Sequence, residues 1–293
     1  MRRLRTAGLV VCAALLAIAG CGGPGSQPTP QPPPPPPPPV NTAPQIKSIA
    51  LSETRAEAGV PITLTATVED AETAVANLTF TWTADTGTFS GSGAVVTWVA
   101  GDDAKTPADV VFNLTVTERY TSGGAQAEHR TTGMQTVRLN NSPRELRELS
   151  IRFLTDFANS RISPDQCVAE FSDSCNGKKD ERADVDDNRH DYEMIGSTIR
   201  HTGLSIAPNR MTAVVNTFCS FTVKVIAAQP REEGCQQGQC PLGSIGTSTG
   251  NCRTNNVYEK GRWWLCDSFF DAIPSLAPRS TFVPTFFRRS GGR

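Results

Sequence analysis

The stretch Val60-Pro61-Ile62-Thr63-Leu64-Thr65-Ala66-Thr67-Val68 places apolar residues at even positions and mostly threonine at odd positions. Successive side chains of a β-strand point to opposite faces of the sheet, so this alternation predicts a strand with one buried and one solvated face. The stretch therefore favours a sheet that covers a core on one side.

Three further segments, 78–84, 94–100 and 110–117, repeat the strand pattern. Glycines, Asp102 and Pro107 lie between them and favour turns. Short strands at this spacing, rich in Val, Thr and Phe, predict an antiparallel β-sandwich over residues 45–140.

Aromatic and glycine positions in this domain add a family resemblance. Thr79-Phe80-Thr81-Trp82, Gly87-Thr88-Phe89 and Val96-Thr97-Trp98 resemble the Ig-like and PKD-like modules of bacterial surface proteins. The resemblance covers this domain only. It implies that Trp82 is a core residue on a central strand and that the module acts as a spacer or makes weak protein contacts.

The acidic turn Glu69-Asp70-Ala71-Glu72 has two interpretations. Calcium takes about six to eight oxygen ligands from several segments, and one turn supplies only part of that set. We expect a solvated loop and no metal.

A helix is predicted to begin at Ser142-Pro143-Arg144-Glu145, where Ser142 would cap the first turn and Pro143 would occupy the first helical position. Apolar residues then recur at helical spacing: Leu146, Leu149, Phe153, Leu154 and Phe157. Ser163-Pro164-Asp165-Gln166 repeats the capping pattern before a shorter helix.

Strands follow these helices. Alternate residues from Ala213 to Val225 are largely apolar, and 257–267 indicates a strand, a glycine turn and a second strand. Two helices followed by a curved sheet ending in a Gly-Arg-Trp hairpin resemble the NTF2-like fold over residues 143–272. A Cys/Gly-rich insertion at 229–252 departs from the compact pattern and leaves the strand number open. The predicted architecture is thus an all-β Ig-like sandwich followed by an α+β NTF2-like cone.

The NTF2-like resemblance implies a pocket in the open end of the cone, which Trp263, Leu265 and Asp267 would line. A carboxylate among aromatic residues is a candidate base, as are His190 and His201. Because an aspartate at the end of a terminal strand is commonly an exposed or capping residue, no catalytic residue is assigned.

The run Asp184-Val185-Asp186-Asp187-Asn188-Arg189-His190-Asp191 suggests a metal site. It fails as an EF-hand loop because Arg189 replaces the required glycine and Ile195 replaces the bidentate glutamate. We expect a charged loop leading into a strand over 192–201, and neither a metal nor a cofactor.

Cysteine supplies the remaining signal. Beyond Cys12 and Cys21, all cysteines lie in the second domain and are disulfide candidates: Cys167, Cys175, Cys219, Cys235, Cys240, Cys252 and Cys266. Their proximity in sequence favours Cys167–Cys175 and Cys235–Cys240 pairs, leaving Cys219, Cys252 and Cys266 to compete for a third bridge and one cysteine unpaired. The spacing does not suit zinc.

The N-terminal segment predicts membrane attachment. Three arginines precede an apolar run and Leu16-Ala17-Ile18-Ala19-Gly20-Cys21, which resembles the lipobox of bacterial lipoproteins. The resemblance implies a signal peptide over 1–20, lipid attachment at Cys21 and, because residue 22 is glycine, sorting to the outer membrane. An ordinary secretory signal with a chance cysteine is the alternative.

Residues 22–44 contain twelve prolines, eight of them consecutive from Pro32 to Pro39. Such a run favours a stiff polyproline II tether, with a docking motif for a protein partner as the alternative. Residues 273–293 form a tail whose role the sequence leaves open.

The net charge and the absence of catalytic motifs limit the functions that the sequence allows. Removing residues 1–20 takes away three arginines and no acidic residue, so the 28 basic residues become 25 against 29 acidic ones, which disfavours nucleic acid as a partner. No nucleophile–base pair or cofactor loop is evident. We expect a noncatalytic, lipid-anchored envelope protein, facing the periplasm or the cell surface, that presents the cone to a small ligand or a protein; a lipid-anchored enzyme using the cone pocket is the alternative.

Overall fold

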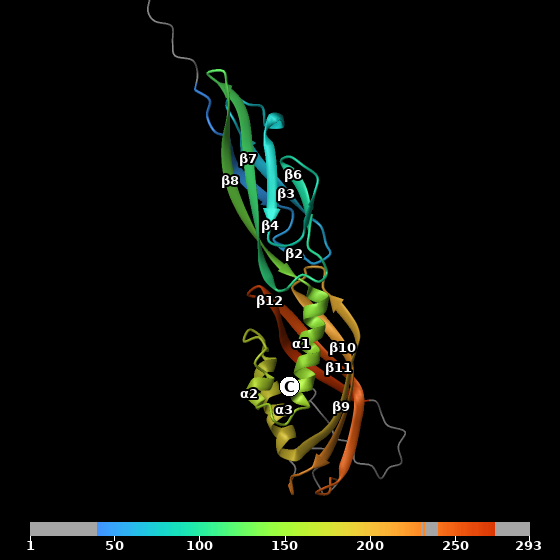
Figure 1. Cartoon of the computed structure of the whole chain (residues 1–293). Helices are drawn as coiled ribbons and strands as arrows, with labels where there is room; N and C mark the ends of the chain where they lie inside the picture. Colours follow the sequence, from blue (N-terminus) through green and yellow to red (C-terminus); the bar gives the residue numbers. More distant parts are fainter. Residues whose placement is uncertain (1–39, 230, 232–239, 273–293) are drawn as a thin grey trace, which may run out of the picture. The chain divides into compact units, whose positions relative to one another are not determined.

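The computed structural model describes residues 40–229, 231 and 240–272. Residues 45–140 form two four-stranded sheets, here called the two-sheet region, and residues 142–272 form the helix–sheet region (Figure 1). The predicted signal peptide, Cys21, most of the proline-rich segment, Cys235 and the predicted tail lie outside the described residues.

The two-sheet region contains one sheet in the order β1-β3-β6-β5 and a second in the order β2-β8-β7-β4. Its strands are β1 Gln45–Leu51, β2 Arg55–Glu57, β3 Ile62–Glu69, β4 Thr79–Ala84, β5 Thr88–Ser90, β6 Val95–Val99, β7 Ala108–Ser122 and β8 Ala125–Asn140, and a short 3-10 helix spans Val75–Asn77. Residues from both sheets share one core, which includes Leu64, Trp98, Phe112 and Leu139. The predicted alternation in β3 is confirmed, since its even-numbered residues 62–68 are buried.

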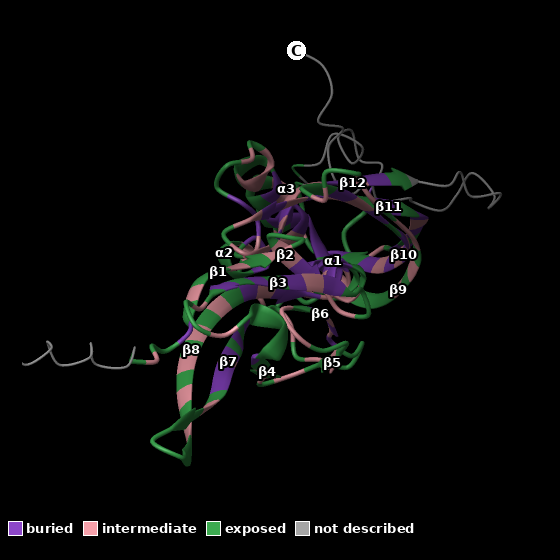
Figure 2. Cartoon of the chain, turned by 90° about the horizontal axis from the view of Figure 1, so that it is seen from above, coloured by how far each residue is buried: buried purple, intermediate pink, exposed green. Residues whose placement is uncertain are grey.

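The sequence did not predict β8, whose side chains are largely polar. Figure 2 shows β8 banded in the exposed and intermediate colours along most of its length. It pairs with β7 over fifteen residue pairs, from Ala108↔Leu139 to Ser122↔Ala125. Backbone pairing rather than an apolar face therefore defines most of this strand.

Trp82 is not on a central strand. It lies on β4, the last strand of its sheet, where it is half-buried and donates to the Gly93 carbonyl at 3.1 Å. The fully buried tryptophan is Trp98, which packs edge-to-face on Phe112 with ring centroids 5.0 Å apart. The two tryptophans have similar local sequences. They differ in burial because Trp82 lies on the edge strand β4, whereas Trp98 lies on β6, between β3 and β5.

The helix–sheet region packs helices on a curled antiparallel sheet in the order β12-β11-β10-β9 (Figure 1). Its elements are α1 Ser142–Phe157, α2 Pro164–Cys167, α3 Gly177–Asp191, β9 Tyr192–Ile206, β10 Thr212–Val225, β11 Ile245–Glu259 and β12 Arg262–Ala272. The apolar stripe predicted for α1 is buried, as are the alternate residues of β10 from Ala213 to Val225. Edge-to-face aromatic pairs such as Phe157–Phe221 fill the space between helix and sheet.

The N-cap of helix α1 lies one residue earlier than the sequence predicted. Asn141, not Ser142, is the N-cap: its side chain accepts from Arg144 N at 3.2 Å, while Glu145 accepts from Asn141 N at 2.8 Å. Ser142 is thereby the first helical residue, with its amide and hydroxyl free to bond elsewhere. The capping box predicted at Ser163 is confirmed.

The charged run 184–191 is not a loop but the second half of α3. The inward side of this helix includes Glu181, Val185 and Asn188, which are buried at helical spacing. A stripe with one apolar member gives almost no hydrophobic periodicity, so the sequence pattern misses the helix.

The predicted hairpin at 257–267 is confirmed. Lys260 and Gly261 form its turn with φ of 51° and 77°, the left-handed pair that tight antiparallel hairpins require. β11 begins at Ile245, so the last eight residues of the supposed insertion, 245–252, belong to the sheet.

Candidate functional site

The two regions meet at a single residue. β8 ends at Asn140 and α1 begins at Ser142, so only Asn141 separates sheet from helix. Asn141 also bonds the two-sheet region itself, since its amide donates to the Asp102 carbonyl at 3.2 Å. The connection is therefore a capped helix start rather than a flexible linker.

Glu57 is the centre of this junction. It ends β2, which pairs with the last residues of β8, and only 12% of its side chain is exposed. One carboxylate oxygen accepts from Ser142 N at 2.9 Å and the other from Ser142 Oγ at 2.7 Å. A carboxylate at this position neutralises the partial positive charge of the α1 N-terminus and satisfies an amide with no partner inside the helix.

Two arginines complete the charge cluster. Arg55 Nε lies 3.5 Å and Arg210 Nη2 lies 3.0 Å from Glu57 Oε1. Arg210 belongs to the turn between β9 and β10, and its φ of 57° is a left-handed conformation that costs a non-glycine residue about 1–2 kcal/mol. Its carbonyl accepts from Arg55 Nη2 at 2.9 Å. The strained turn thus contacts the two-sheet region through both its backbone and its side chain.

Two aromatic residues of the 257–267 hairpin, Tyr258 and Trp263, contact the residues of this charge cluster. The Arg55 guanidinium lies 3.9 Å from the centroid of the Tyr258 ring, and the Tyr258 hydroxyl donates to Asn140 Oδ1 at 2.7 Å. Trp263 Nε1 donates to Ser142 Oγ at 2.8 Å. Burial raises the pKa of Tyr258, which keeps its hydroxyl a donor. The hairpin and the two-sheet region are thereby bonded directly.

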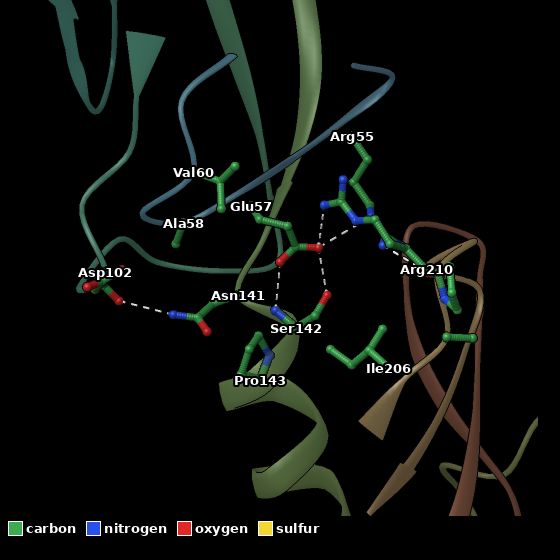
Figure 3. A pocket seen from close by; sticks show the side chains of 12 residues that line it. Arg55, Glu57, Ala58, Val60, Asp102, Asn141, Ser142, Pro143, Ile206 and Arg210 are labelled. Atoms are coloured by element: carbon green, nitrogen blue, oxygen red, sulfur yellow. Dashed lines mark hydrogen bonds and ion pairs between the residues drawn. The ribbon is translucent and has the colours of Figure 1, made fainter. Parts of the chain in front are cut away.

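A cavity of ≈ 540 Å³ opens beside this cluster (Figure 3). Its volume lies in the range of about 300–1,000 Å³ that is usual for small-molecule sites, which often occur where domains meet. Both regions line it: Arg55, Glu57, Ala58, Val60, Asp102, Asn141, Ser142, Pro143, Ile206, Ala207, Pro208 and Arg210. The lining combines apolar walls with a few fixed charges.

Asp102 is the one charged lining group that makes no side-chain bond to any other described residue. Its carboxylate lies over Gly59, where a Cβ atom would come within 2.4 Å of Oδ1 and where φ is +76°. Glycine at position 59 is therefore required both by the backbone conformation and by the close approach of Asp102.

The structure does not place Trp263, Leu265 and Asp267, the predicted pocket residues, on one face of their strand. Trp263 and Leu265 are buried in the core, whereas Asp267 is half-buried on the other face of β12. A register shift opposite Asn255 and Asn256 makes Cys266 an extra residue, and a bulge of this kind reverses the side-chain alternation. Burial raises the pKa of Asp267, but its position separates it from the junction cavity.

The remaining candidate acids and bases lie elsewhere. His190 Nδ1 is 2.7 Å from Asp191 Oδ1 near the end of α3, and His201 is half-buried on β9. In the acidic turn 69–72, Asp70 accepts from the amides of Glu72 and Thr73 and so closes the turn itself. Within residues 40–229, 231 and 240–272, no group of three or more His, Cys, Asp and Glu residues could hold a metal ion.

The disulfide prediction was partly wrong. Cys175 bonds to Cys266 and Cys219 bonds to Cys252, while Cys167 is a buried free thiol. The predicted Cys167–Cys175 pair fails because Phe171 bridges to Leu265, which brings the following segment against β12. Cys240 is disulfide-bonded as well, and Cys235, its predicted partner, lies outside the described residues.

The disulfides bear on the compartment in which the chain folds. Cross-links of this kind form and persist in oxidising, extracytoplasmic environments. Across the residues that the structure describes, no helix is long and apolar enough to cross a membrane.

Sequence reasoning missed the junction residues Arg55, Glu57, Asn140, Arg210 and Tyr258. Arg55 and Arg210 are separated by 155 positions in the chain, and their contact depends on how both regions fold. The only local signal was the turn at 208–210, which ends a strand and precedes another.

The described part of the chain is mostly β-sheet, with a curled sheet and few helices, and we compared this chain with known proteins. No family model matches the chain, and no curated protein matches it either. Among solved structures, a conserved protein from Planctomyces limnophilus is 13% identical, with a TM-score of 0.32, over 45% of this chain and 98% of its own.

Two further structures cover a similar share of the chain. A protein of unknown function with a cystatin-like fold from Nostoc punctiforme is 17% identical over 46% of this chain and 92% of its own, with a TM-score of 0.31. A protein of unknown function from Mycobacterium tuberculosis is 10% identical over 46% of this chain and 73% of its own, with a TM-score of 0.31.

Proposed function

We propose that this chain is a noncatalytic, lipid-anchored protein of the bacterial cell envelope that binds a small ligand in the junction pocket. The observation on which the proposal depends is the cavity beside Glu57, whose walls come from both regions and in which the side chains of Glu57 and Ser142 are fixed by hydrogen bonds. Fixed polar groups favour binding because little ordering is needed when a ligand enters.

The anchoring part of the proposal rests on sequence and on compartment. The lipobox-like run ending at Cys21 and the proline-rich segment after it suit attachment at a distance from the outer membrane. The disulfides Cys175–Cys266 and Cys219–Cys252 support an extracytoplasmic location.

The strand order supports an Ig-like assignment for the two-sheet region. In the constant-type Ig fold, strands A, B, E and D form one sheet and C, F and G form the other. The orders β1-β3-β6-β5 and β8-β7-β4 follow that scheme, with β2 added in parallel beside β8. This region would act as a spacer that also supplies half of the pocket.

The helices before a curled antiparallel sheet support the NTF2-like assignment for the helix–sheet region. The interior between α1 and the sheet is filled by aromatic side chains, including Phe153, Phe157, Phe221 and Phe270. That packing favours binding at the junction over chemistry inside the cone.

Mass spectrometry of small molecules that copurify with the full chain tests the proposal. Val60→Trp would fill the pocket, and Val95→Trp is its matched control, because both valines are about half exposed in the two-sheet region and only Val60 lines the cavity. We expect one copurifying molecule that is lost from Val60→Trp and kept by Val95→Trp. Retention in both variants, or no copurifying molecule, would contradict the proposal.

Lipid attachment has a separate test. Cells expressing the chain are fed labelled palmitate, and the label is expected on the native chain and absent from Cys21→Ala. A label-free native chain found in the soluble envelope fraction would overturn the anchoring part alone.

A further inference from the structure

The junction pocket has unused bonding capacity at two places. Glu57 is fully occupied, because Ser142 and two arginines surround its carboxylate. Arg55 Nη1, in contrast, is a buried nitrogen without a hydrogen-bond partner among the described residues, and Arg210 Nη1 lies 3.7 Å from Glu53 Oε2, beyond hydrogen-bond distance. A buried donor such as Arg55 Nη1 carries a desolvation cost that a ligand acceptor would relieve.

The second place is Asp102, whose carboxylate makes no bond to another described side chain. Figure 3 shows Asp102 on one side of Glu57 and Ser142, and Arg55 and Arg210 on the other. The pocket therefore offers a free acceptor at one end and free donors at the other.

The wall between these ends is apolar. Val60, Pro143 and Ile206 line it together with Ala58, Ala207 and Pro208. Because Arg55 and Arg210 are already neutralised by Glu57 and Glu53, an anion alone would gain hydrogen bonds but little net charge attraction. A ligand with both charges and an apolar body uses every unsatisfied group.

We infer that the junction pocket binds a short apolar peptide with free termini, of about dipeptide size, placing its ammonium group at Asp102 and its carboxylate at Arg210 and Arg55. This inference rests on the proposed function, since it names the ligand class of the same pocket. The bonds to both termini are charge-assisted, which makes them shorter and stronger than hydrogen bonds between neutral groups.

Calorimetric titration of the full chain with three matched probes tests the ligand class. The probes are Leu-Leu, N-acetyl-Leu-Leu, which lacks the ammonium, and Leu-Leu amide, which lacks the carboxylate. Losing one charge-assisted bond weakens binding by about tenfold or more, so Leu-Leu is expected to bind about tenfold more tightly than either analogue. Equal binding of the three probes, or no binding of Leu-Leu, would overturn the inference.

Variants assign each end of the ligand. Asp102→Asn is expected to abolish the preference for Leu-Leu over N-acetyl-Leu-Leu, whereas its neighbour control Asp103→Asn, which does not line the pocket, should preserve it. Arg210→Gly is expected to abolish the preference over the amide, and glycine tolerates the φ of 57° at that position. If Arg210→Gly unfolds, Arg210→Lys keeps the charge, removes the guanidinium fork, and should reduce the same preference.

The two proposals fail in distinguishable ways. If a copurifying molecule is lost from Val60→Trp but no dipeptide binds, the pocket is a ligand site and the peptide assignment is wrong. If Asp102→Asn still prefers Leu-Leu over its acetylated form, the ammonium lies elsewhere and the assignment is likewise overturned.

Discussion

The two-sheet region and the helix–sheet region are held together by different means. The first contains no cysteine and is held together by its long β7–β8 ladder and by a core that includes Trp98 and Phe112. The second contains all seven cysteines that follow Cys21, and its described disulfides tie a segment before α3 to β12 and one central strand to another. Cys175–Cys266 fixes a segment that is docked on the outer strand β12, whereas Cys219–Cys252 joins two strands that the β10–β11 ladder already pairs.

The largest expected effect on stability concerns the Cys175–Cys266 disulfide of the helix–sheet region. The bond joins residues 91 positions apart, and closing a loop of that length contributes about 4 kcal/mol by chain entropy. The double variant Cys175→Ala with Cys266→Ala should lose about that much stability in urea unfolding of the full chain. An unchanged unfolding midpoint would show that the bond does not stabilise the helix–sheet region.

The next effect concerns the boundary between the regions. Glu57→Gln removes the charge that Ser142 and both arginines share, and breaking such a nearly buried pair costs about 3 kcal/mol. Glu53→Gln is the matched control: its carboxylate is 53% exposed and lies 3.7 Å from Arg210, so the loss should be below about 1 kcal/mol. Equal losses in the two variants would contradict the central role of Glu57.

A pH-dependent effect should be confined to the helix–sheet region. Burial raises the pKa of Glu181 to about 8, while Ser268 Oγ donates to its carboxyl at 2.9 Å. The folded state therefore holds a proton that the unfolded chain releases near pH 4.5, so this stability is complete below that pH and is lost as pH rises through 8. Glu181→Gln should flatten the urea midpoint across this window, and Glu148→Gln on the exposed face of α1 should leave the slope unchanged.

The smallest effect concerns the free thiol. Burial raises the pKa of Cys167 to about 12, so almost no thiolate exists at neutral pH. Iodoacetamide at pH 8 should leave Cys167 unmodified in the native chain and should alkylate it in urea, as followed by peptide mass spectrometry. Rapid native labelling would indicate that α2 opens readily from the core.

The difference between the regions also explains what could be predicted. Strands such as β3 and β10 and the helix α1 have strong periodicity, because their apolar residues face one core. Helix α3 buries mainly polar residues and β8 is held by its backbone, so neither has a hydrophobic pattern. The bulge at Cys266 then reversed the faces of β12 and separated Asp267 from Trp263.

The junction pocket was beyond prediction for a further reason. Glu57, Ser142 and Arg210 each have an ordinary local sequence, and their chemistry arises only when β2, α1 and the β9–β10 turn meet. One sequence contains no information on such long-range pairs.

The single-residue connection at Asn141 limits how this chain can be divided or recombined. Dividing the chain there would deprive Glu57 of its Ser142 donors, remove the N-cap from α1 and separate Arg55 from the Tyr258 ring. Each half would then end in polar groups that have lost their hydrogen-bond partners. Recombination that exchanges one region as an independent cassette should therefore fail unless the β2 segment and the β9–β10 turn move with it.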